Sequence, residues 1–557
     1  MKSVLQLLIV QALVMITTVL PAQFTGGIGR GDSFSEKSNS NLGNNFVQSG
    51  FWSETANWSA NKLPDEKEMV YLMADCYVDG AATVSTLINT PGASLTIKPS
   101  GQLTVSGFLD NQGTLTIESD ASGTGSLIHN TPNITAAVNR YIEAWSSANH
   151  GWHLMSSPVA NQAISTEFVN IFEIPYISNG VDLYKWYEPL GIWINIKNQY
   201  GGYNAGIAPQ SWSSSNNPIF ETGKGYLIAY NANQNKLFSG ILNITDVEVG
   251  NLTYTEYKPG RGWHLLGNPF SATITFNQGS WNKINIGAYA QVWDETAASY
   301  KIISGDEVIP PHNGFMVYTS GNGSLTIPAD ARLHSDSNWY KSVNENRHIV
   351  LKANDPDGKT SQETIITFHP DATPGFDLNF DSYFLTGFAP MFYSISNNKL
   401  LALNALPECN KELVIPLGFV KNNSANFNIT LEQNTTEQTL WLVDMKNNSE
   451  HNLSLENYAF ISALDDDPNR FLLKFESNEE SVNNAPPSAY VYQNTLYLPD
   501  NSGPTKVEVF DPIGRCVLTS EITGDGLQSM PLSLRGGIYI FRITGNGNTT
   551  TLKALLP

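Results

Sequence analysis

The chain is short of cysteine and of positive charge, and each shortage excludes a class of protein. Its 557 residues contain three cysteines, which lie far apart at Cys76, Cys409 and Cys516. This spacing offers neither a disulfide framework nor a cysteine-based metal site, so packing must stabilise the fold. Only 31 lysine and arginine residues stand against 51 aspartate and glutamate residues, which gives a net charge of −20. Nucleic acid needs a basic surface, and we therefore predict that it is not a partner.

Common catalytic motifs and long amphipathic helix patterns are also missing. The sequence has no Gly-x-Ser-x-Gly nucleophile elbow, no His-Glu-x-x-His zinc helix and no Walker-type phosphate loop. No two acids are paired at a recognisable strand end, as a glycosidase would need. We therefore expect no catalytic residue and favour binding over turnover. A secreted hydrolase of polysaccharide is the alternative, and perturbed carboxylates gathered in one cleft would favour it.

The start of the sequence holds its longest apolar run. Lys2 is followed by mostly apolar residues from Val4 to Leu20 and then by Pro21-Ala22-Gln23. A basic start, an apolar stretch and a small residue before a polar one are typical of a secretory signal peptide, here residues 1–22. No other segment approaches the length that crosses a membrane. We expect a mature chain without a transmembrane segment, in a protein that is secreted or attached to the outer-membrane surface.

Short strand-like segments separated by turns predict an all-β, multidomain fold. Residues 23–50 have the composition of a flexible linker, and residues 51–140 contain repeated apolar segments such as Ser94-Leu-Thr-Ile97. Segments this short, with regular Gly/Asn turns, predict a β-helix-like solenoid that begins with Phe51-Trp52 and Asn57-Trp58. An ordinary β-sandwich is the alternative for this region.

An internal duplication follows the solenoid. Three motifs recur in the same order: Gly151-Trp152-His153-Leu154 as Gly262-Trp263-His264-Leu265, Leu183-Tyr-Lys-Trp186 as Gln291-Val-Trp293-Asp294, and Gly223-Lys-Gly225-Tyr226 as His312-Asn-Gly314-Phe315. We predict two β-rich repeats, residues 141–250 and 251–340, which pack as a pair with Trp152 and Trp263 in their cores. The repeated histidines should serve packing, because a zinc site needs three or four converging ligands.

The first repeat is longer than the second between its last two motifs, and this insertion is rich in aromatic residues. Trp193, Tyr200, Tyr203 and Trp212 lie there among glycine, asparagine and serine residues. This composition suits an exposed loop, and such rings stack on sugars and anchor protein interfaces. We predict these four residues as the binding site for a glycan or protein ligand. In the alternative, the rings close over the core of their own repeat.

Residues 345–480 contain six or more strand-like segments with regular turns, which predict a Greek-key β-sandwich. An early turn of this region reads Asp355-Pro-Asp357-Gly358. Carboxylates at this spacing can contribute to a calcium site, so Asp355 and Asp357 are the candidate calcium ligands. Asp-Gly is also common in hairpin turns, and this second interpretation is favoured. We expect no other cofactor.

Residues 488–557 predict a further small sandwich of antiparallel strands. Tyr490 to Tyr497 alternates like one half-buried strand. Val507-Glu-Val-Phe510 is a strand that runs into the turn Asp511-Pro-Ile-Gly514-Arg515. Gly537-Ile-Tyr539-Ile-Phe-Arg542 predicts another strand, and Lys553 follows in a last strand-like segment.

These C-terminal motifs resemble the type A C-terminal sorting domain of proteins exported by the type IX secretion system of Bacteroidota. The resemblance rests on the Phe-Asp-x-x-Gly-Arg turn, the Gly-Ile-Tyr-x-x-Arg strand and the final lysine, in that order. It implies that the secretion machinery reads a sorting signal made of Asp511, Gly514, Arg515, Gly537, Tyr539 and Lys553. The resemblance further implies a mature protein that is released or attached at the cell surface. We predict that its body is an adhesin-like or structural array that binds polysaccharide or protein.

Overall fold

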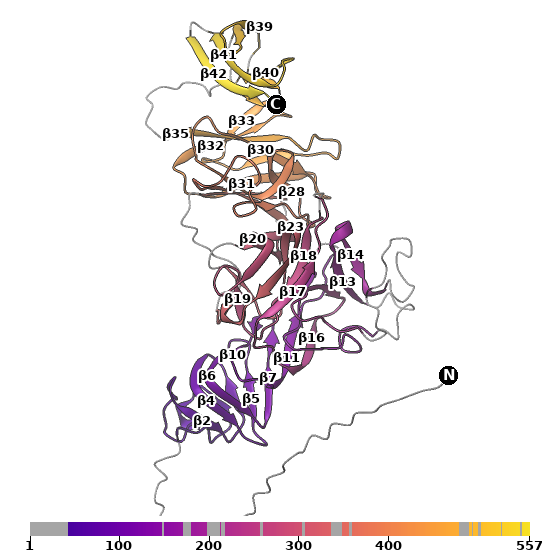
Figure 1. The fold of residues 1–557 in the computed structure, drawn as a ribbon, viewed down its shortest axis with the longest axis vertical. Coiled ribbons are helices and arrows are strands. Elements are labelled where there is room, and N and C mark those ends of the chain that lie inside the picture. The colour runs from indigo at the N-terminus through magenta and orange to yellow at the C-terminus, as the bar shows by residue number, and fades with distance from the viewer. Residues whose placement is uncertain are drawn as a thin grey trace, which may run out of the picture. The chain divides into compact units, whose positions relative to one another are not determined.

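The protein is built from strands, as the sequence predicts (Figure 1). The computed structural model describes residues 43–147, 150–170, 180–197, 212, 218–256, 260–303, 307–335, 348–355, 359–477, 489–492, 494–498, 503–524, 526–545 and 548–556. In these residues the only helices are short 3-10 turns, η1 (Thr55–Asn57), η2 (Glu188–Leu190) and η4 (Ala329–Ala331). The predicted all-β fold class is therefore confirmed. No helix in the described part of the chain has the length and apolarity that a membrane crossing requires.

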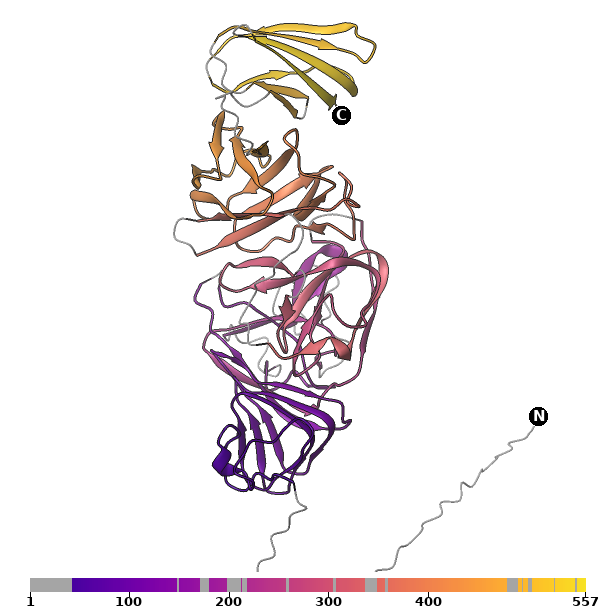
Figure 2. The ribbon, with the colours of Figure 1, turned by 90° about the vertical axis from the view of Figure 1, so that its left-hand side faces the viewer.

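A stack of two parallel sheets forms the first part of the fold (Figure 2). One sheet holds β1 (Gly50–Phe51), β3 (Cys76–Val78), β5 (Ser94–Ile97), β7 (Thr114–Ile117) and β11 (Thr135–Ile142), and the other holds β2 (Met69–Leu72), β4 (Ala81–Asn89), β6 (Gln102–Asn111) and β10 (Ser126–His129). Strands β8 (Ser119–Asp120) and β9 (Gly123–Thr124) pair with each other between β7 and β10. Successive long strands alternate between the two sheets, and each pairs in parallel with a strand of the preceding rung, as in a β-solenoid. Alternate apolar side chains such as Leu95, Leu103 and Leu115 are buried between the sheets.

Two units with the same strand order follow. The first runs β12 (His153–Met155), β15 (Tyr226–Tyr230), β13 (Val181–Tyr187), β14 (Ile192–Asn195), and the second runs β18 (Trp263–Gly267), β23 (Gly314–Ile327), β20 (Asn282–Asp294), β21 (Ser299–Ile303). Their registers also match. His153 pairs with Ile228, as His264 pairs with Val317. The duplicated motifs therefore occupy equivalent places in two copies of one structure.

Five further strands lie in or beside the two units, and some of them pair with strands of the solenoid or of the second unit. They are β16 (Gln234–Ile241), β17 (Val247–Leu252), β19 (Thr273–Thr275), β22 (Val308–Ile309) and β24 (Arg332–Leu333). Strand β16 pairs with β11 and so extends a solenoid sheet, while β17 pairs with the second half of β23. The two copies also exchange backbone hydrogen bonds: Ser156 N–H donates to the His312 carbonyl, and Gly267 N–H donates to the Gly223 carbonyl. These donors and acceptors are equivalent in the two copies, so the copies pack reciprocally.

The repeated tryptophans differ in burial, although the repeated histidines behave alike. Trp263 is 1% exposed and packs edge-on against Tyr318. Trp152 is only half-buried, so the predicted core position holds for Trp263 and is wrong for Trp152. Each histidine bonds through Nε2 to a backbone carbonyl, His153 to Glu143 at 2.9 Å and His264 to Thr253 at 2.7 Å. These bonds agree with the packing role expected for the two imidazoles.

The described residues between 348 and 477 form one eleven-stranded sheet. Its strands are β25 (His348–Asn354), β26 (Ser361–Phe368), β27 (Ser382–Tyr383), β28 (Met391–Ser396), β29 (Lys399–Leu406), β30 (Val414–Val420), β31 (Asn426–Asn434), β32 (Gln438–Asp444), β33 (Ser449–Asn452), β34 (Tyr458–Ile461) and β35 (Phe471–Ser477). Edge-to-face aromatic contacts fill its core, where Phe419 lies 4.9 Å from Phe427 and 4.8 Å from Phe460 between ring centroids.

The C-terminal region forms two small antiparallel sheets. One holds β36 (Tyr490–Tyr492), β37 (Thr495–Leu498) and β40 (Gln528–Pro531), and the other holds β38 (Thr505–Phe510), β39 (Cys516–Ile522), β41 (Gly537–Gly545) and β42 (Asn548–Leu556). The single strand predicted from Tyr490 to Tyr497 is wrong, because the chain turns back at Asn494 and pairs β36 with β37. Asn494 has a φ of 58°, a left-handed conformation that asparagine tolerates well in turns.

Candidate functional site

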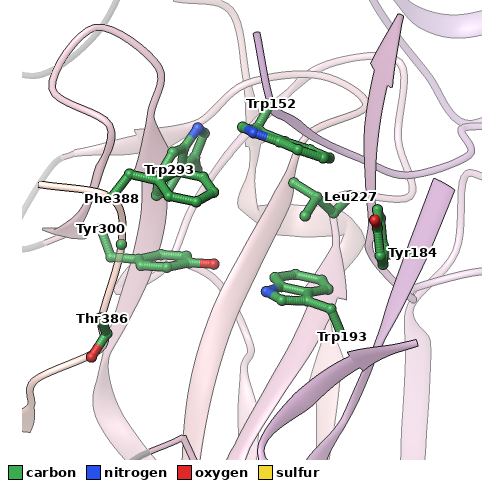
Figure 3. Close-up of a pocket in the computed structure, with 9 residues that line it drawn as sticks. Trp152, Tyr184, Trp193, Leu227, Trp293, Tyr300, Thr386 and Phe388 are labelled. Carbon is green, nitrogen blue, oxygen red and sulfur yellow. The ribbon is translucent and has the colours of Figure 1, made fainter. Parts of the chain in front are cut away.

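An aromatic pocket with a volume of about 340 Å³ is the best candidate for a binding site (Figure 3). Its lining consists of Trp152, Tyr184, Trp193, Leu227, Trp293, Tyr300, Thr386, Gly387 and Phe388, and we call this set the aromatic pocket. The first four come from the first repeat, the next two from the second repeat, and the last three from the segment between β27 and β28. Pockets of this size, lined by aromatic side chains with a few polar groups, are typical of small-ligand sites.

Two equivalent aromatic pairs supply three of the rings that line the pocket, which are Trp193, Trp293 and Tyr300. Trp186 pairs across β13 and β14 with Trp193, at 4.9 Å between ring centroids, and Trp293 pairs across β20 and β21 with Tyr300, at 5.1 Å. Both pairs are edge-to-face, with interplanar angles of 76° and 68°. Trp193 and Tyr300 are thus equivalent residues of the two repeats, and Figure 3 shows the Tyr300 hydroxyl pointing into the cavity toward Trp193. The duplication itself supplies two facing aromatic walls.

Trp152 and Phe388 close another side of the pocket. Their rings are stacked at 6.3 Å between centroids, and Trp152 also contacts Tyr184 at 5.8 Å. Phe388 is 40% exposed, while its ring packs edge-on against Trp293 at 5.9 Å. This part of the wall therefore presents aromatic surface to solvent and can be covered by a ligand.

Backbone hydrogen bonds from the second repeat fix the segment that carries Phe388. The Ala298 carbonyl accepts hydrogen bonds from the N–H groups of Phe388 and Ala389, at 2.9 and 3.1 Å. Ala298 has a φ of 54° and follows Asp294, whose side chain accepts the Thr296 and Ala297 N–H groups. The tight turn between β20 and β21 thus aims a carbonyl at the segment that carries Phe388, which makes the pocket a preorganised site.

Polar groups in the pocket are neutral. They are the indole N–H groups of the tryptophans, the hydroxyls of Tyr184 and Tyr300, and the hydroxyl of Thr386. Burial raises the pKa of Tyr300, so its hydroxyl keeps its proton at neutral pH. The lining includes neither a carboxylate nor a cationic side chain. Such a site can stack on apolar faces and exchange hydrogen bonds with hydroxyl groups.

The four aromatic residues that the insertion predicts as a binding site do not lie together in the described structure. Trp193 lines the pocket. Trp212 is 4% exposed, and its carbonyl accepts a hydrogen bond from the Lys185 ammonium, so this ring belongs to the core as in the alternative interpretation. Tyr200 and Tyr203 lie outside the described residues. Sequence patterns did not identify Trp152 and Trp293 as pocket residues, although their recurrence in the duplication was a usable signal. They did not identify Phe388 either, which no local pattern marks.

The residues predicted as a sorting signal all lie on or beside the sheet β39-β38-β41-β42. Asp511 accepts hydrogen bonds from the backbone and guanidinium of Arg515, and Gly514 completes the turn with a φ of 83°. The Tyr539 hydroxyl, two residues after Gly537, donates to the Arg535 carbonyl at 3.0 Å. On the neighbouring strand, Lys553 is exposed and pairs with Ile540. The sheet therefore brings the separate sequence motifs onto one structural element.

Of the two candidate calcium ligands, the structure describes Asp355, whose side chain is held by local hydrogen bonds. The Asp355 side chain accepts hydrogen bonds from the Lys359 N–H and the Thr360 hydroxyl, and it is 4% exposed. Asp357 lies outside the described residues. No cluster of three or more metal-ligating side chains occurs in the part of the chain that the structure describes.

Fold and site together define an all-β protein with a solenoid, a duplicated β-unit and a preorganised aromatic pocket. The chain belongs to the family described as "Domain of unknown function (DUF8693)", whose model matches residues 45–306 and 289–475. No curated protein matches the sequence. Among solved structures, the chain shows a likeness to dimeric latent PorU from Porphyromonas gingivalis with 9% identity and a TM-score of 0.12. The match covers 59% of this chain and 36% of that chain.

Proposed function

We propose that this protein is an adhesin-like carbohydrate-binding protein, secreted or attached at the cell surface, and that the aromatic pocket is its glycan site. The observation that carries this proposal is the gathering of Trp152, Trp193 and Phe388 around one cavity with partly exposed rings. Aromatic faces desolvate the C–H face of a sugar ring, and the surrounding hydroxyl and indole groups can bond its hydroxyls. A pocket already formed in the free protein lowers the entropic cost of binding.

The lining of the pocket favours binding over hydrolysis. Hydrolysis of a glycoside requires two carboxyl groups about 5–10 Å apart on either side of the scissile bond. None of the lining residues is acidic. The nearby Glu295 carboxylate is engaged by His153 Nδ1 at 2.6 Å, and Asp294 holds the β20–β21 turn. These contacts give the two acids structural roles.

We expect alanine at both Trp193 and Phe388 to weaken glycan binding at least 30-fold, about 2 kcal/mol, because each ring offers open stacking surface. The measurement is a glycan array followed by calorimetry on the best ligand. Phe51→Ala is a matched control, because Phe51 is a similarly exposed ring, 42%, on solenoid strand β1. Unchanged affinity in the double variant, with the fold intact by circular dichroism, would exclude the pocket as the glycan site.

Export through the type IX secretion system is the second part of the proposal. It is supported by the C-terminal motifs and by the exposed face of β41 and β42, where the apolar pair Ile538 and Leu555 lies beside Ile540 and Lys553. An exposed apolar surface with a positive charge suits recognition by a partner protein.

Deletion from Ala489 onward should therefore retain the protein in the periplasm of its host. Tyr490 packs against Val443 and Leu472, so folding of the shortened chain must be checked separately by limited proteolysis. Fusing residues 488–557 to an unrelated periplasmic protein tests the signal without this complication. Retention of that fusion, or normal surface delivery of the shortened chain, would refute the sorting role.

A further inference from the structure

We infer that the aromatic pocket selects uncharged sugar residues and rejects uronic, sialic and sulfated ones. This inference rests on the proposed glycan-binding function and names the class of sugar that the site takes. Three observations support this selectivity. The lining is uncharged, the neighbouring lysines lie on the opposite faces of their strands, and acidic side chains lie nearby.

Neutral donors and aromatic rings dominate the lining of the cavity. An anionic group that enters it loses water and meets no cation among the lining residues. A buried carboxylate without a partner loses its hydration and gains nothing in return, whereas a sugar hydroxyl can exchange its water for the hydroxyls of Tyr300 and Thr386. The cost of removing water from a charged group therefore lets the pocket distinguish anionic sugars from neutral sugars of the same shape.

The lysines nearest in sequence to the lining rings are directed away from the pocket. Lys185 lies between Tyr184 and Trp186 on β13, and Lys301 follows Tyr300 on β21. Successive side chains of a strand point to opposite faces of the sheet, so both lysines lie on the face opposite to the aromatic residues. The Lys185 ammonium is moreover bound to the Trp212 carbonyl, which keeps it from reaching a ligand in the pocket.

Acidic groups stand close to the same site. Asp294 and Glu295 directly follow Trp293 at the end of β20, where the amides of the turn bind Asp294 and the His153 imidazole binds Glu295. The whole chain carries a net charge of −20. A polyanionic glycan is therefore repelled on approach as well as disfavoured inside the pocket, and salt screens only the first of these effects.

The test compares one polymer in two charge states. The neutral oligosaccharide that binds best on an array is oxidised at C6, which converts the hydroxymethyl groups to carboxylates and leaves the ring unchanged. We expect calorimetry on the full protein to show at least tenfold weaker binding of the oxidised form, and the difference should persist at 0.5 M NaCl.

A positive charge placed at the exposed rim residue Thr386 should reduce the preference for the neutral form. Thr386→Lys should raise affinity for the oxidised oligosaccharide at least about fivefold by pairing with its carboxylate, while the neutral control Thr386→Gln should not. Equal binding of the two forms, still lost in Trp193→Ala, would overturn the selectivity and leave the proposed function standing. Failure of Thr386→Lys to raise this affinity would also overturn the selectivity alone. Binding of no carbohydrate at all would overturn both.

Discussion

Replacing Trp263 by alanine should lower the free energy of unfolding by about 3–5 kcal/mol, while the same change at the equivalent Trp152 should cost less than about 2 kcal/mol. Trp263 is 1% exposed, its ring packs on Tyr318, and its carbonyl accepts the Trp186 indole N–H at 2.8 Å. Removing this ring opens a cavity inside a cluster of buried aromatic residues. Trp152 has one side toward the pocket, so its removal exposes less buried surface.

The two variants are matched because they alter the same motif in the two repeats. Denaturant unfolding followed by circular dichroism measures stability, and glycan binding measures function. We expect Trp263→Ala to lose stability and Trp152→Ala to lose binding. Equal losses of stability in both variants would contradict the different burial of the two rings.

Arg470→Met should destabilise the eleven-stranded sheet by about 3–5 kcal/mol, because it leaves a buried carboxylate without its partner. Arg470 is 2% exposed and binds Asp444, itself 1% exposed, through Nε at 3.0 Å and Nη2 at 2.6 Å. Its Nη1 also donates to the Ile461 carbonyl at 2.7 Å and lies 3.3 Å from Asp466. The Asp444 carboxylate additionally accepts the Tyr458 hydroxyl, which makes this a buried polar network.

Arg542→Met provides the control for this prediction. Arg542 binds Glu508 through two guanidinium nitrogens, at 2.9 and 2.6 Å, but it is 49% exposed. Exposed ion pairs contribute about 0–1 kcal/mol, so its removal should change unfolding little. A similar loss of unfolding free energy in the two variants would show that burial does not make the Arg470–Asp444 ion pair more important for stability.

The same network should make stability sensitive to acid. Desolvation raises the pKa of Asp466, but hydrogen bonds from Lys446, the Ala463 amide and Ser462 outweigh it and lower the pKa from 3.8 to about 2. A carboxyl whose pKa is lower in the folded protein adds stability above its unfolded pKa and loses it as pH falls through the folded value. The free energy of unfolding, measured from pH 5 to pH 2, should therefore fall between about pH 4 and pH 2. Asp466→Asn should make this fall with pH less steep. An unchanged slope would contradict this role.

Local sequence patterns predicted the strands well, because side-chain alternation and turn formation depend on residues that are close together in the sequence. They also revealed the duplication, since Trp152 and Trp263 lie in the same motif, and they marked the segments around Asp511 and Tyr539. The pattern failed at Asn494, where one residue in a left-handed conformation turned an apparent strand into a hairpin.

Composition and short-range periodicity are enough to predict the all-β class, the repeated unit and the acidic character of the chain. For residues 51–140 they favoured a solenoid but left a β-sandwich open. Long-range packing places Trp263 in the core and Trp152 in the pocket wall, since one identical motif meets Tyr318 in one copy and Phe388 in the other. It also decided that Trp212 is buried while Trp193 faces the cavity. A pocket made by residues from two repeats and a third segment depends on long-range packing, which no local pattern encodes.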